Sequence, residues 1–254
     1  MSKSHPQQWT VADPWERPDP ALVEALAAFP TTQIADCGGP VGVVGPGIAH
    51  VAGGTGFCGT AATLWTKPGD ILFILKSPDV VRPGDVLVVD GGGRLDAAVI
   101  GDVVGAALVE NGAVGLLVDG AVRDVDGIDA VGLPTFARGT HPATGSNTGP
   151  GALGVTVQCG GVVVQPGDVV RGDRSGVVVV PAAHLAAVVA LTQQVADKEA
   201  GWLAERATGR GLPDVLGIDA VIAAGRETTV VGEAPGVDID DVPDDAADDF
   251  EGHA

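Results

Sequence analysis

An α/β fold is predicted by three features of this 254-residue sequence. Short apolar runs rich in valine, such as Val86–Asp90 and Val177–Val180, have the length and composition of buried strands. The segment Gly101–Asn111 places apolar residues at helical spacing between two such runs. Pro-Gly-Asp triplets, which favour turns, stand at 68–70, 83–85 and 166–168. These features together indicate a single compact domain of strands joined by tight turns and short helices.

Changes in composition along the chain predict three segments. Residues 1–19 are polar and proline-rich and read as an N-terminal arm, whereas residues 20–207 carry the strand and helix patterns of the compact domain. Residues 208–254 form a C-terminal extension that contains eight acidic residues between Asp238 and Glu251. Because like charges repel one another, this acidic tail is expected to be solvated and disordered.

The overall charge excludes two classes of partner. The sequence has 14 basic and 33 acidic residues, a net charge of −19, which would repel nucleic acid and anionic membranes. We therefore expect neither as a partner. The three cysteines form no CxxC pair, and no signal peptide or membrane span is visible. These features fit a protein of the reducing cytoplasm.

The start of the predicted helix is a candidate anion site. Asp102 begins this helix, and the backbone N–H groups near Val103, Val104 and Gly105 are expected to lack partners inside it. Such groups carry partial positive charge and suit a carboxylate. The alternative is that Asp102 is only the N-cap of the helix.

Two charged residues are expected near this helix start. Arg123 and Asp124 follow the predicted strand Val114–Asp119 across a predicted turn at Gly120–Val122. In a strand–helix–strand unit, helix starts and the carboxyl ends of parallel strands share one edge of the sheet, where ligands bind. The alternative is a surface ion pair between the two side chains.

These residue types suit the chemistry of an oxo acid. Arg123 can hold a carboxylate or enolate oxygen through two parallel hydrogen bonds, and Asp124 can hold a hydrated divalent cation such as Mg²⁺. Asp102 can orient a water molecule or move a proton. An oxo acid bound to that cation would have its carbonyl polarised.

Five stretches of the chain resemble the RraA-like family in the family's order: residues 32–36, 83–93, 118–124, 166–168 and 172–181. This family contains the class II 4-hydroxy-4-methyl-2-oxoglutarate/4-carboxy-4-hydroxy-2-oxoadipate aldolases, which also decarboxylate oxaloacetate, and the RNase E regulator proteins. The resemblance implies a swivelling-type β/β/α sandwich. It also implies trimers, or hexamers of paired trimers, with sites between subunits.

The aldolase branch is marked by Asp, twenty residues, then Arg-Asp, which here are Asp102 and Arg123-Asp124. The regulator branch typically has Gly at the first position. The resemblance implies that Asp124 binds the metal, Mg²⁺, Mn²⁺ or another divalent cation, partly through water. It assigns the pyruvyl part of the substrate to Arg123 and the substrate carboxylate to the backbone of Val103 and Val104.

The resemblance also implies one more catalytic residue, and the sequence departs from the family's pattern at two positions. Glu199 is the candidate for the glutamate that aldolases of the family place near the metal waters from a neighbouring subunit. Ile71 and Leu75 stand where many of these aldolases carry Asn and His. The expected activity is metal-dependent cleavage of a 4-hydroxy-2-oxo acid to pyruvate, with oxaloacetate decarboxylation.

Other functions are less well supported. A Schiff-base aldolase needs a buried lysine, and none of the four lysines lies inside an apolar strand. The glycines 91–93 lack the GxGxxG spacing of a nucleotide site, and the histidines form no zinc motif. The main rival is a non-enzymatic RraA-like regulator or binding module that acts on a protein partner.

Overall fold

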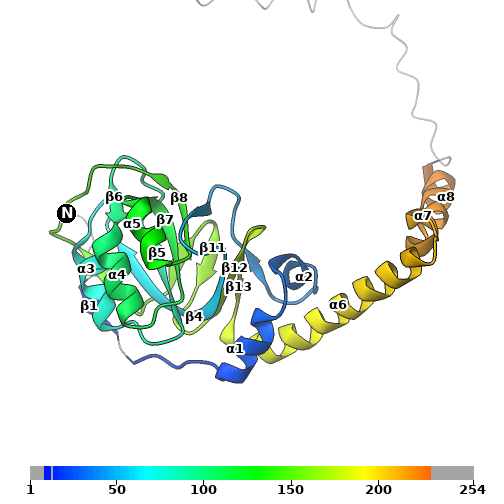
Figure 1. Cartoon of the computed structure of the whole chain (residues 1–254), viewed down its shortest axis with the longest axis horizontal. Helices are drawn as coiled ribbons and strands as arrows, with labels where there is room; N and C mark the ends of the chain where they lie inside the picture. The colour runs from blue at the N-terminus through cyan, green and yellow to red at the C-terminus, as the bar shows by residue number, and fades with distance from the viewer. Residues whose placement is uncertain (1–8, 13, 230–254) are drawn as a thin grey trace, which may run out of the picture. The chain divides into compact units, whose positions relative to one another are not determined.

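The computed structural model describes residues 9–12 and 14–229, and the acidic stretch Asp238–Glu251 lies outside these residues. The chain divides into two compact units, the first ending at Lys198 and the second beginning at Glu199 (Figure 1). Among the described residues, none of the helices is both long and apolar enough to cross a membrane.

The strands found among the described residues all belong to the first unit. They are β1 Thr10–Val11, β2 Gly42–Val43, β3 Ala49–Ala52, β4 Phe57–Thr66, β5 Asp85–Asp90, β6 Ala98–Ile100, β7 Gly115–Val122, β8 Thr135–Thr140, β9 Gly151–Leu153, β10 Val157–Cys159, β11 Val162–Val164, β12 Val169–Asp173 and β13 Gly176–Val180.

The helices belong to both units, and α6 runs through the boundary between them. They are α1 Pro20–Ala27, α2 Thr31–Ala35, α3 Leu72–Lys76, α4 Asp102–Glu110, α5 Val125–Val131, α6 Leu185–Ala207, α7 Leu212–Leu216 and α8 Ile218–Thr229, with short 3₁₀ turns at Ser77–Asp79 and Ala182–His184.

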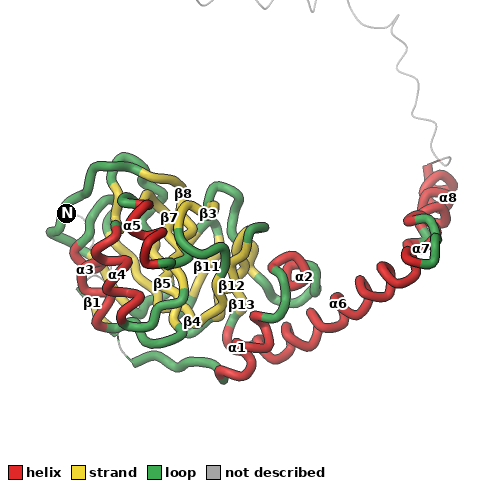
Figure 2. The backbone as a smooth tube through the Cα atoms, in the orientation of Figure 1, coloured by secondary structure: helices red, strands yellow, loops and turns green. Residues whose placement is uncertain are grey.

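A mixed sheet organises the first unit and confirms the predicted α/β class. Its main path runs β2-β13-β12-β4-β5-β7-β8-β3, and β6 and β9 pair with β7 and β4 (Figure 2). The central pairs β4–β5, β5–β7 and β7–β8 are parallel, and the flanking pairs β4–β12, β12–β13 and β3–β8 are antiparallel. Central parallel strands covered on both faces need continuous apolar runs, which explains the valine-rich segments of the sequence.

The central strands supply side chains to two hydrophobic cores. In β5, Leu87 and Val89 pack into the core beneath α3, α4 and α5, whereas Val86 and Val88 pack into the core beneath β10 and β11. This division follows from the alternation of side chains along a strand. A third core lies between α1, α2, the start of α6 and strands β12 and β13.

Strand β7 is longer than the sequence predicted, and the turn expected at Gly120–Val122 is wrong. These residues remain in the strand because β6 pairs with them: Ala98 lies opposite Ala121, and Ile100 lies opposite Val122. The register with β8 shifts between Val118 and Ala121, so the glycine accompanies a β-bulge and not a turn. The strand therefore delivers Arg123 directly to the edge of the sheet.

The described part of the N-terminal arm packs on the first unit. Strand β1 pairs in parallel with β9, and the Trp9 ring lies edge-on to Phe73 with 6.1 Å between ring centroids. Farther along, Arg17 stacks over Trp15 and forms an ion pair with the buried Asp85 at 2.7 Å. The arm thus contacts both the sheet and a helix of the main body.

An ion pair between the buried Asp119 and the partly exposed Arg138 connects β7, β8 and the hairpin of β10 and β11. Both oxygens of Asp119, which is 6% exposed, accept hydrogen bonds from Arg138, and Oδ2 also accepts one from the Gly160 amide at 2.7 Å. Burial would raise the pKa of Asp119, but the hydrogen bonds from Arg138 and Gly160 outweigh it and hold the pKa below its ordinary value.

Replacing Asp119 with asparagine is expected to destabilise the fold by about 2 kcal/mol at neutral pH, because it leaves a half-buried guanidinium unpaired. Since the pKa of Asp119 is lowered in the folded chain, its contribution is complete above the unfolded pKa of about 3.9 and disappears as the pH falls through the folded value. Urea unfolding of both proteins at pH 7 and pH 3 measures this difference. Asp96→Asn, at an exposed ion pair, is the control and should change nothing. An equal difference at both pH values would contradict the account.

Candidate active site

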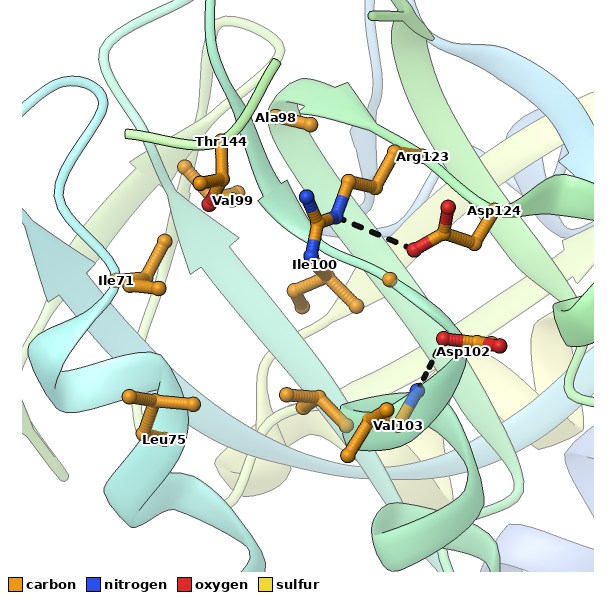
Figure 3. A pocket seen from close by; sticks show the side chains of 12 residues that line it. Ile71, Leu75, Ala98, Val99, Ile100, Asp102, Val103, Arg123, Asp124 and Thr144 are labelled. Atoms are coloured by element: carbon orange, nitrogen blue, oxygen red, sulfur yellow. Dashed lines mark hydrogen bonds and ion pairs between the residues drawn. The ribbon is translucent and has the colours of Figure 1, made fainter. Parts of the chain in front are cut away.

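A cavity of about 260 Å³ lies where α3, β6, the start of α4 and the end of β7 meet (Figure 3). It is lined by five residues that the sequence predicted as parts of one site: Asp102, Val103, Val104, Arg123 and Asp124. Strands β6 and β7 are parallel, so their carboxyl ends lie at one edge of the sheet and place these residues together.

The helix start differs in one detail from the prediction. The N-cap of α4 is Gly101, in an extended conformation, and Asp102 is the first helical residue, so Asp102 is not the N-cap. The Gly105 amide donates to the Gly101 carbonyl at 3.0 Å, which is the first bond of the helix. The expectation that the Gly105 amide lacks a partner inside the helix is therefore wrong. The reason is that the helix begins at Asp102 itself, so its first hydrogen bond already uses the fourth residue.

A carboxylate of the chain itself contacts the helix start. The Val103 N–H donates to Oδ1 of Asp102 at 2.7 Å, in the first turn where negative charge is favourable. The Val103 side chain is 79% exposed at the rim of the cavity. A substrate carboxylate would have to displace Asp102 to accept a bond from Val103, which leaves the Val104 N–H as the other amide at this end.

The end of β7 holds Arg123 in place through its backbone. The Arg123 N–H donates to the Ile100 carbonyl at 2.8 Å, which continues the pairing with β6. The guanidinium extends over Ile100, and its Nε lies 3.2 Å from Oδ2 of Asp124 (Figure 3). Both side chains are about two-fifths exposed, at 39% and 44%, so the pair is open to solvent and to a ligand.

Asp124 has an unusual backbone conformation. Its φ of 53° and ψ of 43° lie in the left-handed region, which a residue with a Cβ adopts at a cost of about 1 kcal/mol. It occupies the N-cap position of α5, yet its side chain makes no capping hydrogen bond. Its carbonyl accepts from the Gly127 and Ile128 amides at 3.0 and 3.1 Å. The strained backbone therefore directs the carboxylate to Arg123 and away from the helix that it begins.

Two glycines that the sequence reasoning missed make room for these side chains. A Cβ on Gly101 would lie 2.5 Å from Oδ2 of Asp124 and 3.1 Å from Cγ of Arg123. A Cβ on Gly127 would lie 2.5 Å from Cβ of Asp102. Atoms cannot approach this closely, so a side chain at either position would displace its neighbour. The Asp124 carboxylate therefore needs a glycine at 101, and the Asp102 side chain needs a glycine at 127. Only the Gly-Asp order at 101–102 hinted at this in the sequence.

The donor groups fit a hydrated hard cation. Asp102 and Asp124 lie on the same side of the cavity and present carboxylate oxygens, which Mg²⁺ and Mn²⁺ prefer (Figure 3). Within residues 9–12 and 14–229, no cluster of three or more His, Cys, Asp or Glu is found that could enclose a metal. Water would have to fill most of the coordination sphere, as is usual for Mg²⁺.

Nucleophilic side chains are unfavourably placed for chemistry here. Lys76 is exposed and forms an ion pair with Asp79 at 2.6 Å, and no lysine is among the described residues that line the cavity. Burial raises the pKa of the Cys58 thiol to about 11 and that of Cys159 well above its ordinary value, so both thiols stay protonated at neutral pH.

Glu199 lies on α6 in the second unit and does not line the described cavity of the first. Its predicted role, in which it reaches the site of a neighbouring subunit, stays a prediction. Ile71 and Leu75, the two apolar departures, do line the cavity, together with Thr144 from the loop after β8.

The fold and the cavity together define an α/β protein with a candidate acid-binding site at a sheet edge. Residues 21–179 match the RraA-like family, described as Aldolase/RraA. The chain belongs to this family, which confirms the resemblance found in the sequence.

Several known proteins are similar to this chain. A protein of Halalkalibacterium halodurans, provisionally named 4-hydroxy-4-methyl-2-oxoglutarate aldolase, is 42% identical over 123 residues, which are 48% of this chain and 59% of that protein. The match thus spans less than two thirds of that relative. A protein of Ectopseudomonas mendocina with the same provisional name is 37% identical over 143 residues, covering 56% of this chain and 88% of the relative.

A solved structure extends the similarity to the fold. Streptomyces coelicolor RraAS2, described as an unusual member of the RNase ES inhibitor RraA protein family, is 30% identical with a TM-score of 0.65. The superposition covers 78% of this chain and 100% of RraAS2. The family thus includes proteins named as aldolases and proteins named as RNase inhibitors.

Proposed function

We propose that this protein is a divalent-metal-dependent aldolase, a carbon–carbon lyase that cleaves a 4-hydroxy-2-oxo acid to pyruvate and also decarboxylates oxaloacetate. The observation that carries the proposal is the left-handed Asp124, whose carboxylate is directed toward Arg123 at the cavity. The names of the two bacterial relatives support it. By the family resemblance, the working unit is a trimer or a hexamer of this chain.

The pyruvyl end of the substrate is bound by this chain's own groups. Arg123 and Val104 both line the cavity. Arg123 would hold an oxygen of the oxo acid through its planar guanidinium, and the Val104 amide would hold the carboxylate. Asp124, with water, would hold the cation. When bound, that cation polarises the 2-oxo carbonyl and stabilises the negative charge of an enolate.

Asp102, which lines the cavity, is the group that would move the proton. In the cleavage, the 4-hydroxyl group loses its proton and the bond between C3 and C4 breaks, leaving an aldehyde or ketone and an enolate of pyruvate. Asp102 takes this proton, directly or through a water molecule, and returns it to C3 to give pyruvate. With oxaloacetate, the bond to the C4 carboxylate breaks, CO₂ leaves, and the same enolate takes a proton that water supplies through Asp102.

A metal-dependence experiment tests the proposal. Purified protein with Mg²⁺ or Mn²⁺ and oxaloacetate is expected to release pyruvate faster than the same metal without protein. EDTA should abolish this excess rate, and added metal should restore it. A coupled assay of pyruvate measures the rate.

The alternative is a regulator that binds a protein partner, and the likeness to RraAS2 favours it. If metal-loaded protein turns over neither oxaloacetate nor any 4-hydroxy-2-oxo acid above the protein-free rate, the aldolase proposal fails and the regulator is supported. The Asp102 position speaks for the enzyme, because a regulator needs no carboxylate beside an anion site.

A further inference from the structure

The cavity has two chemically different sides. Asp102, Arg123 and Asp124 form the charged side, and Ile71 and Leu75 lie across from them (Figure 3). The floor between the two sides is also apolar, formed by Val99 and Ile100 of β6, which are 4% and 1% exposed.

We propose that the substrate carries an apolar group at C4, and not a second carboxylate, and that Ile71 and Leu75 determine this preference. The inference rests on the proposed function, because it places the pyruvyl end of the substrate at Arg123 and directs C4 toward the opposite wall.

This apolar wall is anchored by a buried carboxylate. Oδ2 of Asp70, which is fully buried, accepts hydrogen bonds from the Ser146 hydroxyl at 2.7 Å and the Thr148 amide at 2.9 Å, and Oδ1 accepts the Leu72 amide at 2.9 Å. The Ile71 amide donates to the Ser146 carbonyl at 2.7 Å. These bonds join the start of α3 to the loop after β8, so the wall is built before a substrate arrives.

The charges of the cavity disfavour a second carboxylate. Among the described residues that line it, Arg123 is the only cation, and the pyruvyl end already requires it. Lys76 follows Leu75 in the sequence but pairs with Asp79 and does not line the cavity. A distal carboxylate would lose hydration against Ile71 and Leu75 and gain no cation from the described residues that line the cavity, whereas an alkyl group would gain from burial there.

Oxaloacetate is compatible with this wall, although its C4 is a carboxylate. That carboxylate leaves as CO₂, so the hydration it loses beside apolar side chains raises the energy of the ground state more than that of the neutral product. A retained carboxylate, in contrast, is carried through the cleavage and released still charged.

The test compares two substrates of matched shape. 4-Hydroxy-5-methyl-2-oxohexanoate has an isopropyl group where 4-hydroxy-2-oxoglutarate has a carboxylate, and cleavage gives pyruvate from both. We expect kcat/KM to be at least about tenfold higher for the isopropyl substrate. A preference for the carboxylate substrate would overturn the inference.

A variant with a charge at the wall provides a second test. Comparing the ratio of the two kcat/KM values between this variant and wild type cancels any difference in the intrinsic reactivity of the two substrates. Leu75→Arg, at a side chain that is 53% exposed, is expected to shift the ratio of the two kcat/KM values at least about tenfold toward the carboxylate substrate. Leu95→Arg, at a leucine that is 49% exposed and does not line the cavity, is the matched control and should leave the ratio unchanged. Equal ratios in wild type and Leu75→Arg would also overturn the inference.

Failure of this inference and failure of the proposed function give different results. If oxaloacetate is decarboxylated above the protein-free rate but the isopropyl substrate is not preferred, only the substrate class is wrong. If neither substrate nor oxaloacetate is turned over, the proposed function is wrong and the substrate class falls with it.

Discussion

Replacing Asp124 with asparagine is expected to lower kcat/KM for pyruvate release at least about 1,000-fold while leaving the chain as stable as the wild type. Asparagine tolerates the left-handed backbone of this position and keeps the shape of the side chain, but it removes the charge that would hold the cation. A loss of this size corresponds to the several kcal/mol that a cation contributes to the transition state. Pyruvate release and thermal unfolding of the two proteins measure the two effects.

Two further variants sharpen this prediction. Asp126→Asn removes an exposed carboxylate from the first turn of α5, two residues away, and should retain full activity. Asp124→Gly relieves the left-handed conformation, so it should be inactive yet no less stable than wild type. The loss of a cation ligand is expected to cost far more than a factor of about ten in rate. If Asp124→Asn kept more than about a tenth of the wild-type rate, the proposed metal role of Asp124 would be wrong.

Replacing Gly101 with alanine is expected to lower kcat/KM about 100-fold, although Gly101 carries no chemical group. Its φ of −134° suits alanine, so the backbone is not strained by the change. The new methyl group would instead stand 2.5 Å from the Asp124 carboxylate and 3.2 Å from Nε of Arg123 and would push both aside. Displacements near 1 Å cost about this much in rate.

The control for this variant lies on the same helix. A Cβ on Gly105 would meet Ile128 at 3.6 Å, an ordinary contact, so Gly105→Ala should keep full activity. It should also gain up to about 1 kcal/mol in stability, because alanine favours a helix more than glycine does. A Gly101→Ala protein with wild-type kcat/KM would show that the positions of Asp124 and Arg123 do not matter to the reaction.

Much of the fold could be predicted from local patterns. The helix at 102–110 and the strands at 85–90 and 176–180 lie where apolar periodicity and Pro-Gly turns indicated. The sequence predicts a turn at 120–122 because Gly120 favours turns. The prediction is wrong because the pairing of β6 with β7 keeps these residues extended, and that pairing joins segments about twenty residues apart. A single sequence carries no signal for that pairing.

The site shows the same division between local and long-range information. The proximity of Asp102 to Arg123 and Asp124 follows from the geometry of a strand–helix–strand unit, so the sequence could predict it. The left-handed Asp124 and the close approach of Gly101 depend on how β6, α4 and α5 pack together. The role of Glu199 stays a prediction, because it requires a second copy of the chain.

The most direct measurement is a crystal structure of the protein with Mn²⁺ and oxalate, a stable mimic of the pyruvate enolate. We expect an anomalous peak within direct coordination distance of an Asp124 oxygen, with oxalate between the cation and the Arg123 guanidinium. Mn²⁺ and oxalate bound elsewhere, with Asp124 paired only to Arg123, would contradict it.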